Sequence, residues 1–241
     1  MKLTFLGTRG EIEARRRRHW RHSALLITHE RRRVLIDCGA DWVRRLARIR
    51  PHAIVLTHAH PDHAFGLAQG APCVVMATEA CWQTIERFPI EQRRTIRPGR
   101  PVRVHGLRIE AFEVEHSVRA PAVGYRISAG HGSVFYAPDL VSIVEQRKAL
   151  HGVQLYIGDG ASLTRPLVRR RGRRLIGHAP VSTQLRWCAQ EGVARALITH
   201  CGTQIVTGNA AVMAARVREL GERHGVQAEL AHDGMTRIVR G

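Results

Sequence analysis

Aromatic residues and long apolar runs are scarce in this chain of 241 residues. Phenylalanine, tryptophan and tyrosine together make up 5%, and no apolar stretch approaches the about 18 residues of a membrane-spanning helix. The hydrophobic share is nevertheless 44%, spread over short runs of valine, isoleucine and leucine. This combination excludes a transmembrane helix and predicts one globular domain over residues 1–241. Residues 1–7 turn polar too soon for a signal peptide and predict a first strand.

Closely spaced cysteines are also absent. The five cysteines are odd in number and widely scattered, and none forms a C-x-x-C pair. This pattern favours a reduced, cytoplasmic protein, with no membrane among its partners.

Acidic residues are few, with 20 Asp and Glu against 38 Lys and Arg, which gives a net charge of +18. Most of the positive charge is arginine, concentrated in two blocks at residues 14–22 and 168–174. Guanidinium clusters suit bidentate binding of phosphate, and such a field attracts nucleic acid or another polyanion. A merely solvated surface is the alternative, and charge alone does not separate the two.

The run from Thr57 to His63, Thr-His-Ala-His-Pro-Asp-His, places three imidazoles and a carboxylate within six residues. These are ligands of hydrolytic Zn²⁺ or Mn²⁺ centres. The run follows an apolar strand expected at 53–56, and Pro61 is expected to delay a helix. One ion cannot take all four side chains from so short a segment, so the motif predicts two ions. The alternative is a set of surface histidines in a chain that has 15.

Short β-branched or apolar runs recur along the whole chain and predict strands. They lie at 2–6, 24–28, 34–36, 53–56, 74–77, 107–114, 122–128, 134–137, 155–157, 196–199 and 235–239. Helical spacing predicts helices over 78–88, from a cap at Ser182 or Thr183 through Gln190, and from Asn209 through Leu220, closed by Gly221. Strands alternating with helices predict an α/β sandwich of two sheets covered by helices.

Further ligand types stand where predicted strands end, which is where functional loops concentrate. His116, Asp139 and His200 occupy such positions. A scheme with two ions follows, in which Asp139 bridges because two dications held close together repel each other. Asp159 competes for the bridging role. The first ion would take His58, His60 and His116, and the second would take Asp62, His63 and His200.

The order of these motifs resembles the metallo-β-lactamase superfamily over nearly the whole chain. Residues 5–8 and 36–39 are similar to its opening strands, and 233–235 to its closing turn. Residues 115–118 and 124–126 resemble the branch of tRNA 3′-processing endonucleases (ribonuclease Z) and the cyclic phosphodiesterase of phosphonate breakdown. The resemblance implies an αββα sandwich, two mixed β-sheets flanked by helices.

The resemblance also implies a function: a metal-dependent phosphodiesterase with a hydroxide activated by two divalent ions. Zn²⁺ is the first expectation and Mn²⁺ the alternative. Asp62 would steer the hydroxide, and His178, the extra histidine of this branch, would act near the leaving oxygen. In this fold the two arginine blocks should border the cleft and bind an anionic phosphodiester, RNA or a nucleotide. Their candidate residues are Arg17, Arg18, Arg21, Arg173 and Arg174. A homodimer is a further expectation from the resemblance.

Two other functions stay open at this point. The same metal centre could attack a lactone, ester or thioester, because the ligands do not fix the substrate. A metal-stabilised RNA-binding module without catalysis is the third alternative, for which the positive charge would suffice.

Overall fold

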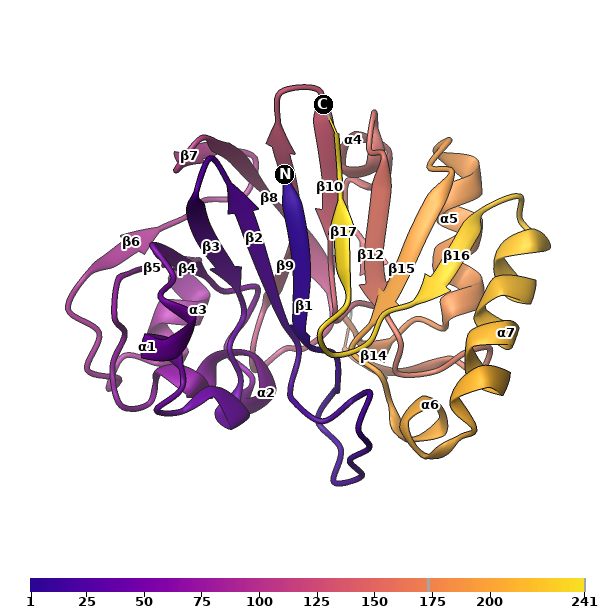
Figure 1. Cartoon of the computed structure of the whole chain (residues 1–241), viewed down its shortest axis with the longest axis horizontal. Helices are drawn as coiled ribbons and strands as arrows, with labels where there is room; N and C mark the ends of the chain where they lie inside the picture. Colours follow the sequence, from indigo (N-terminus) through magenta and orange to yellow (C-terminus); the bar gives the residue numbers. More distant parts are fainter. Residues whose placement is uncertain (173, 241) are drawn as a thin grey trace.

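Two large β-sheets pack face to face, and helices cover their outer faces (Figure 1). The computed structural model describes residues 1–172 and 174–240. One apolar cluster lies between the sheets, and one lies under the helices on each outer side. This layering is the αββα sandwich predicted from the sequence, with both sheets of mixed strand direction.

The first sheet comes from the N-terminal half and the last strand of the chain. Its antiparallel part runs from β17 to β3, and its parallel part from β3 to β6. In spatial order the strands are β17 (Thr236–Ile238), β1 (Lys2–Gly7), β2 (Ala24–His29), β3 (Arg32–Ile36), β4 (Ala53–Val55), β5 (Val74–Ala77) and β6 (Arg93–Thr95).

The second sheet is built the same way, antiparallel from β11 to β10 and parallel from β10 to β16. Its strands in order are β11 (Ser142–Ile143), β8 (Leu107–Glu115), β9 (Ala122–Ala129), β10 (Gly132–Tyr136), β12 (Leu155–Asp159), β15 (Arg195–Thr199) and β16 (Gln227–Leu230). A short strand, β7 (Val102–Val104), pairs with β8 beside this path.

The helices divide between the two outer faces. Those beside the first sheet are η1 (Ala40–Trp42), α1 (Leu46–Ile49), α2 (Pro61–Ala64), η2 (Phe65–Leu67) and α3 (Glu79–Thr84). Those beside the second sheet are α4 (Gln146–Leu150), α5 (Val181–Gln190), α6 (Thr203–Thr207) and α7 (Ala210–Glu222). None of the helices in the described residues is long and apolar enough to cross a membrane.

Every strand predicted from the sequence is present, but the helix boundaries were only partly right. Asn209 caps α7 as predicted, its side chain accepting from the backbone of Ala211 and Val212. The same helix continues through Gly221, where we expected it to stop. Ser182 and Thr183 lie inside α5, which begins at Val181 after Pro180, so the predicted cap was wrong.

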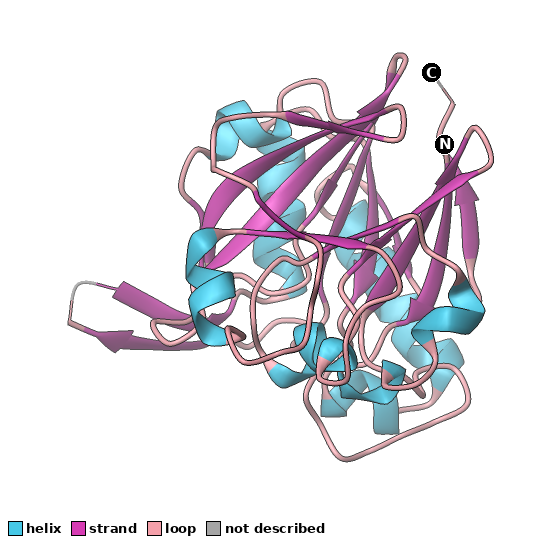
Figure 2. Cartoon of the chain, turned by 90° about the vertical axis from the view of Figure 1, so that its left-hand side faces the viewer, coloured by secondary structure: helices cyan, strands magenta, loops and turns pink. Residues whose placement is uncertain are grey.

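A hairpin of β13 (Leu167–Arg171) and β14 (Arg174–His178) projects from the body of the molecule (Figure 2). It has no counterpart among the predicted strands, because its arginines hide the alternation of polar and apolar side chains. Its base pairs Leu167 with His178, so the hairpin grows out of the region where we expected catalytic residues.

Candidate metal centre

The parallel strands of both sheets end at the same edge, and the loops that follow them carry the candidate ligands. His58 and His60 follow β4, and Asp62 and His63 lie on α2. Helix α2 begins at Pro61 itself, the position where a helix tolerates proline because no amide hydrogen bond is lost. The expectation that Pro61 would delay the helix was therefore wrong.

The second sheet supplies the rest of the site from four more strand ends. His116 follows β8, Asp139 lies beyond β10, Asp159 ends β12 and His200 follows β15. His200 has a positive φ of 50°, a strained conformation for a residue with a side chain. The neighbouring loop approaches closely only because Gly10 has no Cβ, which would lie 2.9 Å from the His200 ring.

The structure brings all seven predicted ligands together in overlapping groups. In each group the possible ligand atoms lie within 4.8 Å of one another. The groups are His58, His60, His116 and Asp139; Asp62, His63, Asp139 and His200; and Asp139, Asp159, His178 and His200. The first two have the membership of the scheme drawn from the sequence, with Asp139 common to both. Their role as ligands stays a prediction.

Asp139 lies at the middle of the cluster. Its Oδ2 is 2.7 Å from His63 Nε2 and 3.3 Å from His58 Nε2, and its Oδ1 is 3.2 Å from His200 Nδ1. Asp159 instead contacts His178 at 2.7 Å and His200 at 3.4 Å. Geometry therefore favours Asp139 over Asp159 as the shared carboxylate.

Hydrogen bonds on the outer side of the cluster fix the protonation of His58 and His116. His116 Nδ1 is 3.0 Å from the carbonyl of Gly177, which can only accept, so Nδ1 carries the proton. The hydroxyl of Thr57 donates to Asp37 at 2.8 Å, so it accepts from His58 Nδ1 at 3.0 Å. In the neutral rings the Nε2 atoms therefore present bare lone pairs to the interior.

An outer hydrogen bond also orients the third imidazole, His63, although burial is outweighed there by Asp62, Asp139 and Asp37, which raise its pKa well above the usual value. Its Nδ1 donates to Asp37 at 2.9 Å, which leaves Nε2 facing the carboxylates of Asp62 and Asp139. Within the described residues, no neighbour makes a well-directed hydrogen bond to the buried His63 Nε2 or Asp139 Oδ1, although Asp139 Oδ2 lies 2.7 Å from His63 Nε2 and His200 Nδ1 lies 3.2 Å from Asp139 Oδ1. Lone pairs and carboxylate oxygens that converge in this way suit divalent cations, so the donor set fits the metal ions that the fold implies.

Burial and neighbouring charges shift the pKa values of the histidines in this cluster in opposite directions. Burial lowers the pKa of His58 well below its usual value and that of His60 to about 4. Burial opposes protonation of His200 and His178 as well, but neighbouring carboxylates raise their pKa values to about 9 and about 11. Burial likewise opposes ionisation of Asp139, yet the surrounding histidines hold its pKa well below the usual range.

A cavity of about 520 Å³ opens onto the cluster. His60, Asp62, His178 and His200 line it, together with Gly10, Glu11 and Ile12 from the loop between β1 and β2. A second cavity of about 770 Å³ lies beside it, and His116 lines both. The candidate ligands are therefore open to solvent through the smaller cavity, and the larger cavity lies next to it.

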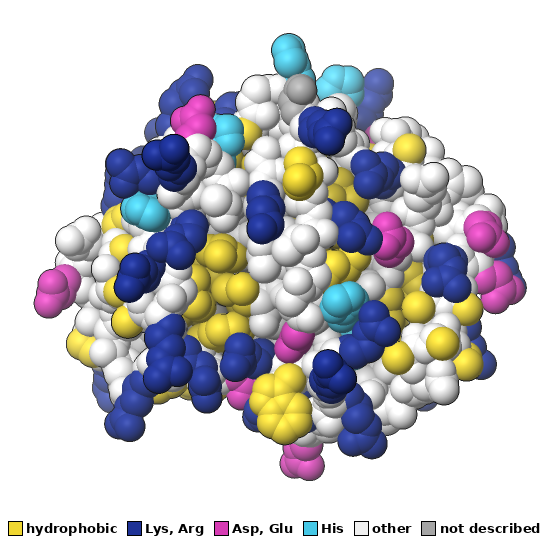
Figure 3. Space-filling model, viewed as in Figure 1, with side chains coloured by type: hydrophobic (Ala, Val, Ile, Leu, Met, Phe, Trp, Pro, Cys, Tyr) yellow, Lys and Arg dark blue, Asp and Glu magenta, His cyan; other side chains and the backbone are white. Residues whose placement is uncertain are grey.

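The arginines predicted to bind substrate are distributed differently from the expectation. Within the described residues, neither Arg17, Arg18 nor Arg21 lines the cavity at the cluster. Arg18 lines a separate hollow, and the guanidinium of Arg21 lies 5.0 Å above the Trp42 ring. Arg174 lines the second cavity, while Arg173 lies outside the described residues. Basic side chains instead cover the visible face broadly (Figure 3).

Sequence reasoning overlooked two residues behind the ligands, Asp37 and Thr57. Asp37 is fully buried and accepts hydrogen bonds from His63 and from the Thr57 hydroxyl. The same hydroxyl accepts a hydrogen bond from His58, so Asp37 is connected to both histidines. It comes directly after β3, so the strand-end signal that pointed to the other ligands was present here too.

Several known proteins are similar to this chain in sequence. A family model described as the beta-lactamase superfamily domain matches residues 32–201. Ribonuclease Z of Methanopyrus kandleri is 32% identical over 142 residues, which cover 52% of this chain and 49% of that protein. Ribonuclease Z of Bradyrhizobium diazoefficiens is 29% identical over 178 residues, covering 63% and 55%. The chain thus spans about half the length of the curated relatives it matches.

Solved structures match over nearly the full length. A diphosphatase from the PhnP family superimposes with a TM-score of 0.74 at 18% identity, covering 99% of this chain and 98% of the other. The short form of human tRNase Z superimposes with a TM-score of 0.67 at 19% identity, covering 100% of both chains. At such low identities these likenesses establish the fold alone, and the fold is the one predicted.

Proposed function

Because the chain belongs to the beta-lactamase superfamily, we propose that it is a metal-dependent hydrolase that cleaves phosphoric diesters. The observation that carries the proposal is the convergence of imidazole nitrogens and carboxylate oxygens in overlapping groups, within each of which the atoms lie 4.8 Å or less apart. The proposal takes residues 1–241 as one domain, with Zn²⁺ as the metal and Mn²⁺ as the alternative. A homodimer stays a prediction.

In the proposed centre, His58, His60 and His116 would hold one ion. Asp62, His63 and His200 would hold the other, and Asp139 would contribute to both. Two divalent ions in one site supply an activated solvent nucleophile and neutralise the charge that develops on the phosphoryl group. The protein itself holds the donor atoms in place, since outer hydrogen bonds orient three of the imidazoles.

Two other side chains act on the substrate in this proposal. Asp62 Oδ2 lies 3.0 Å from His200 Nε2, so its second carboxylate oxygen would orient the attacking solvent molecule. His178 Nδ1 lies 2.7 Å from Asp159 and 3.2 Å from Asp139. These contacts aim the ring and leave Nε2 for the cavity that His178 lines, where it would donate a proton to the leaving oxygen.

Support for a phosphodiester comes from the relatives and from charge. The curated relatives are named ribonuclease Z, and one structural neighbour is a diphosphatase. A net charge of +18 attracts polyanions and raises the rate at which an anionic substrate arrives. RNA or a nucleotide is therefore the proposed substrate class, in preference to a neutral lactone or ester.

The test is hydrolysis of bis(p-nitrophenyl) phosphate by metal-loaded protein. His60→Ala should abolish turnover, and His178→Ala should lower kcat by about 10²–10⁴, the usual contribution of a positioned acid. His151→Ala, an exposed histidine after α4, is the matched control and should leave turnover unchanged. Absence of turnover with Zn²⁺, Mn²⁺ and Co²⁺ alike would contradict the proposal.

The same preparation decides between the other functions. Faster turnover of lactone or thioester substrates than of phosphodiesters would identify a carboxylic ester hydrolase. Salt-dependent RNA binding that survives chelation, without cleavage of any substrate, would indicate a binding module.

A further inference from the structure

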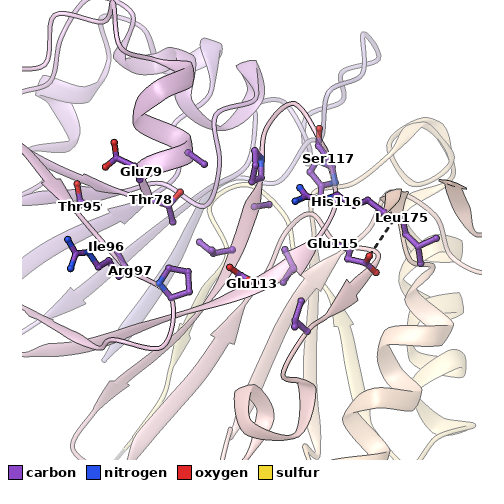
Figure 4. Close-up of a pocket in the computed structure, with 18 residues that line it drawn as sticks. Thr78, Glu79, Thr95, Ile96, Arg97, Glu113, Glu115, His116, Ser117 and Leu175 are labelled. Atoms are coloured by element: carbon purple, nitrogen blue, oxygen red, sulfur yellow. Dashed lines mark hydrogen bonds between the residues drawn. The ribbon is translucent and has the colours of Figure 1, made fainter. Parts of the chain in front are cut away.

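The larger of the two cavities, of about 770 Å³ (Figure 4), borders the candidate metal centre at His116, which lines both cavities. One side is made by the start of α3 and the segment that follows β6, and the other by His116 and Leu175. Glu113 and Glu115 of β8 lie between these sides. The volume falls within the about 300–1,000 Å³ typical of small-molecule sites.

We propose that this cavity binds a nucleoside unit, as one ester arm of a diester whose phosphate lies at the metal centre. The proposal rests on the proposed function and adds to it the chemical class of the group beside the phosphate. Three features carry it: the position of the cavity, its apolar lining and its unpaired carboxylate.

The position follows from His116, which lines both cavities. The backbone holds this wall in place, because Gly177 donates to the carbonyl of His116 and Leu175 donates to Glu115. A tetrahedral phosphate sends its two ester arms in different directions. An arm leaving the metal centre past His116 enters this cavity directly.

The lining and the rim are rich in apolar side chains. Ile96, Val114, Val144 and Leu175 face the cavity. Val144 is 62% exposed, and Leu167, 42% exposed, lies at the neighbouring metal cavity. Apolar side chains left in water at a concave surface indicate a partner that covers them, and a flat ring such as a nucleobase fits this requirement.

The cavity also carries charged groups of both signs, namely Glu79, Glu113, Glu115, Arg97 and Arg174. Glu115 is held by Ser142 and by the backbone of Leu175, whereas Glu113 is exposed and has no ion pair within the described residues. Carboxylates accept hydrogen bonds from hydroxyl and ring N–H groups, and guanidinium groups donate to ring nitrogens and carbonyl oxygens. A nucleoside offers both kinds of partner.

The experiment compares two diesters with the same leaving group, thymidine 5′-(p-nitrophenyl phosphate) and methyl p-nitrophenyl phosphate. The wild-type holoenzyme should prefer the nucleoside ester about tenfold or more in kcat/KM, as expected for burial of one ring-sized apolar group. Val144→Trp should fill the cavity and remove this preference by raising KM, with kcat for the methyl ester unchanged. Val212→Trp, an exposed valine on α7, is the matched control.

A second pair of variants tests the carboxylate. Glu113→Gln should weaken the preference for the nucleoside ester severalfold, while Glu86→Gln, at another exposed glutamate, should not. The proposal is overturned if Val144→Trp slows both esters equally, or if it changes neither.

Binding of free thymidine, measured by calorimetry, separates this proposal from the proposed function. If the wild-type protein hydrolyses neither ester, the phosphodiesterase proposal fails, but the thymidine measurement still tests whether the cavity binds a nucleoside. Thymidine binding that is weakened by Val144→Trp and kept in Val212→Trp would support the nucleoside site. No thymidine binding by the wild-type protein would overturn it.

Discussion

Substituting Asp37 by asparagine should weaken both halves of the proposed metal centre without changing its shape. Asp37 Oδ1 accepts from the Thr57 amide at 2.8 Å, and Oδ2 accepts from both the Thr57 hydroxyl and His63 Nδ1. An asparagine has only one acceptor oxygen. With its amide nitrogen in the place of Oδ2, His63 must accept at Nδ1 and therefore carry its proton on Nε2, pointing at Asp62 and Asp139.

The size of the effect follows from this change of tautomer. Loss of an outer partner of a ligating histidine costs about 10–100-fold in metal affinity, or about 1.4–2.8 kcal/mol. The loss should fall on both groups of ligands. The Thr57 hydroxyl no longer has an acceptor at Asp37 and donates to His58 Nδ1 instead, so His58 also carries its proton on Nε2. Asp37 has a positive φ of 60°, a conformation that asparagine tolerates, so backbone strain should add little.

Competition with a chromophoric chelator measures the effect, with Zn²⁺ titrated into metal-free protein. Wild-type protein should take up two ions with high affinity, and Asp37→Asn should bind both ions about 10–100-fold more weakly. Thermal unfolding of the two metal-free proteins controls for a loss of folding. If Asp37→Asn binds both ions as tightly as the wild type does, Asp37 does not fix the tautomer of His63 and the reasoning fails.

Two further predictions concern the surface and the stability of the protein. In β13, Arg169 shares a face with Leu167, which lines the metal cavity, and Arg170 lies on the other face. Arg169→Ser should therefore reduce the salt dependence of single-stranded RNA binding by about 0.7 in log–log slope, and Arg170→Ser should not. Burial lowers the pKa of His19 to about 4 from 6.5. As the pH falls below 6.5, His19 takes up a proton in the unfolded chain, but in the folded protein it does so only near pH 4. The free energy of unfolding therefore falls by up to about 3 kcal/mol as the pH is lowered from 6.5 to 4. In denaturant titrations of metal-free protein at several pH values, His19→Phe should flatten this fall by about 1.4 kcal/mol per pH unit, whereas His131→Phe, at an exposed position, should not. An unchanged fall in His19→Phe would contradict the assignment.

The strands of this fold were predictable because their burial is periodic or continuous. Strand β4 is buried throughout, and β9 alternates at its end, so each carries a clear apolar signal. The hairpin β13–β14 carries arginines on both faces, and β6 is exposed along its whole length. Their strand character depends on pairing with a neighbour, which a local pattern does not contain.

Helix boundaries failed for a related reason. Ser182 is a good capping residue in isolation, but the backbone of Val181 is already held by Ser162, and that of Ser182 by Leu163. The start of α5 is therefore set by contacts with a distant segment rather than by its own side chains. At α7, where Asn209 provides the cap locally, the predicted start was right.

The convergence of the candidate ligands was predictable because strand ends of one edge meet in any sheet of this topology. The position of the arginines was not, since a loop of polar residues has no pattern that fixes its path. The loop between β1 and β2 turns Gly10, Glu11 and Ile12 toward the metal cavity. Two contacts anchor this loop. The buried Arg9 forms an ion pair with Asp41, and the carboxylate of Asp233 accepts a hydrogen bond from the backbone amide of Trp20.

Acidic residues are scarce in this chain, but several of them lie together in the candidate site. Asp62, Asp139 and Asp159 are buried together in a chain of net charge +18, so negative charge is concentrated where cations are proposed to bind. Three carboxylates carry three negative charges, and the raised pKa values of His178 and His200 add two positive charges that offset most of them in the metal-free protein. Two divalent ions would add four positive charges and make the centre attractive to a phosphate. In the proposed function, the positive surface and the loaded centre would therefore attract the same anionic substrate.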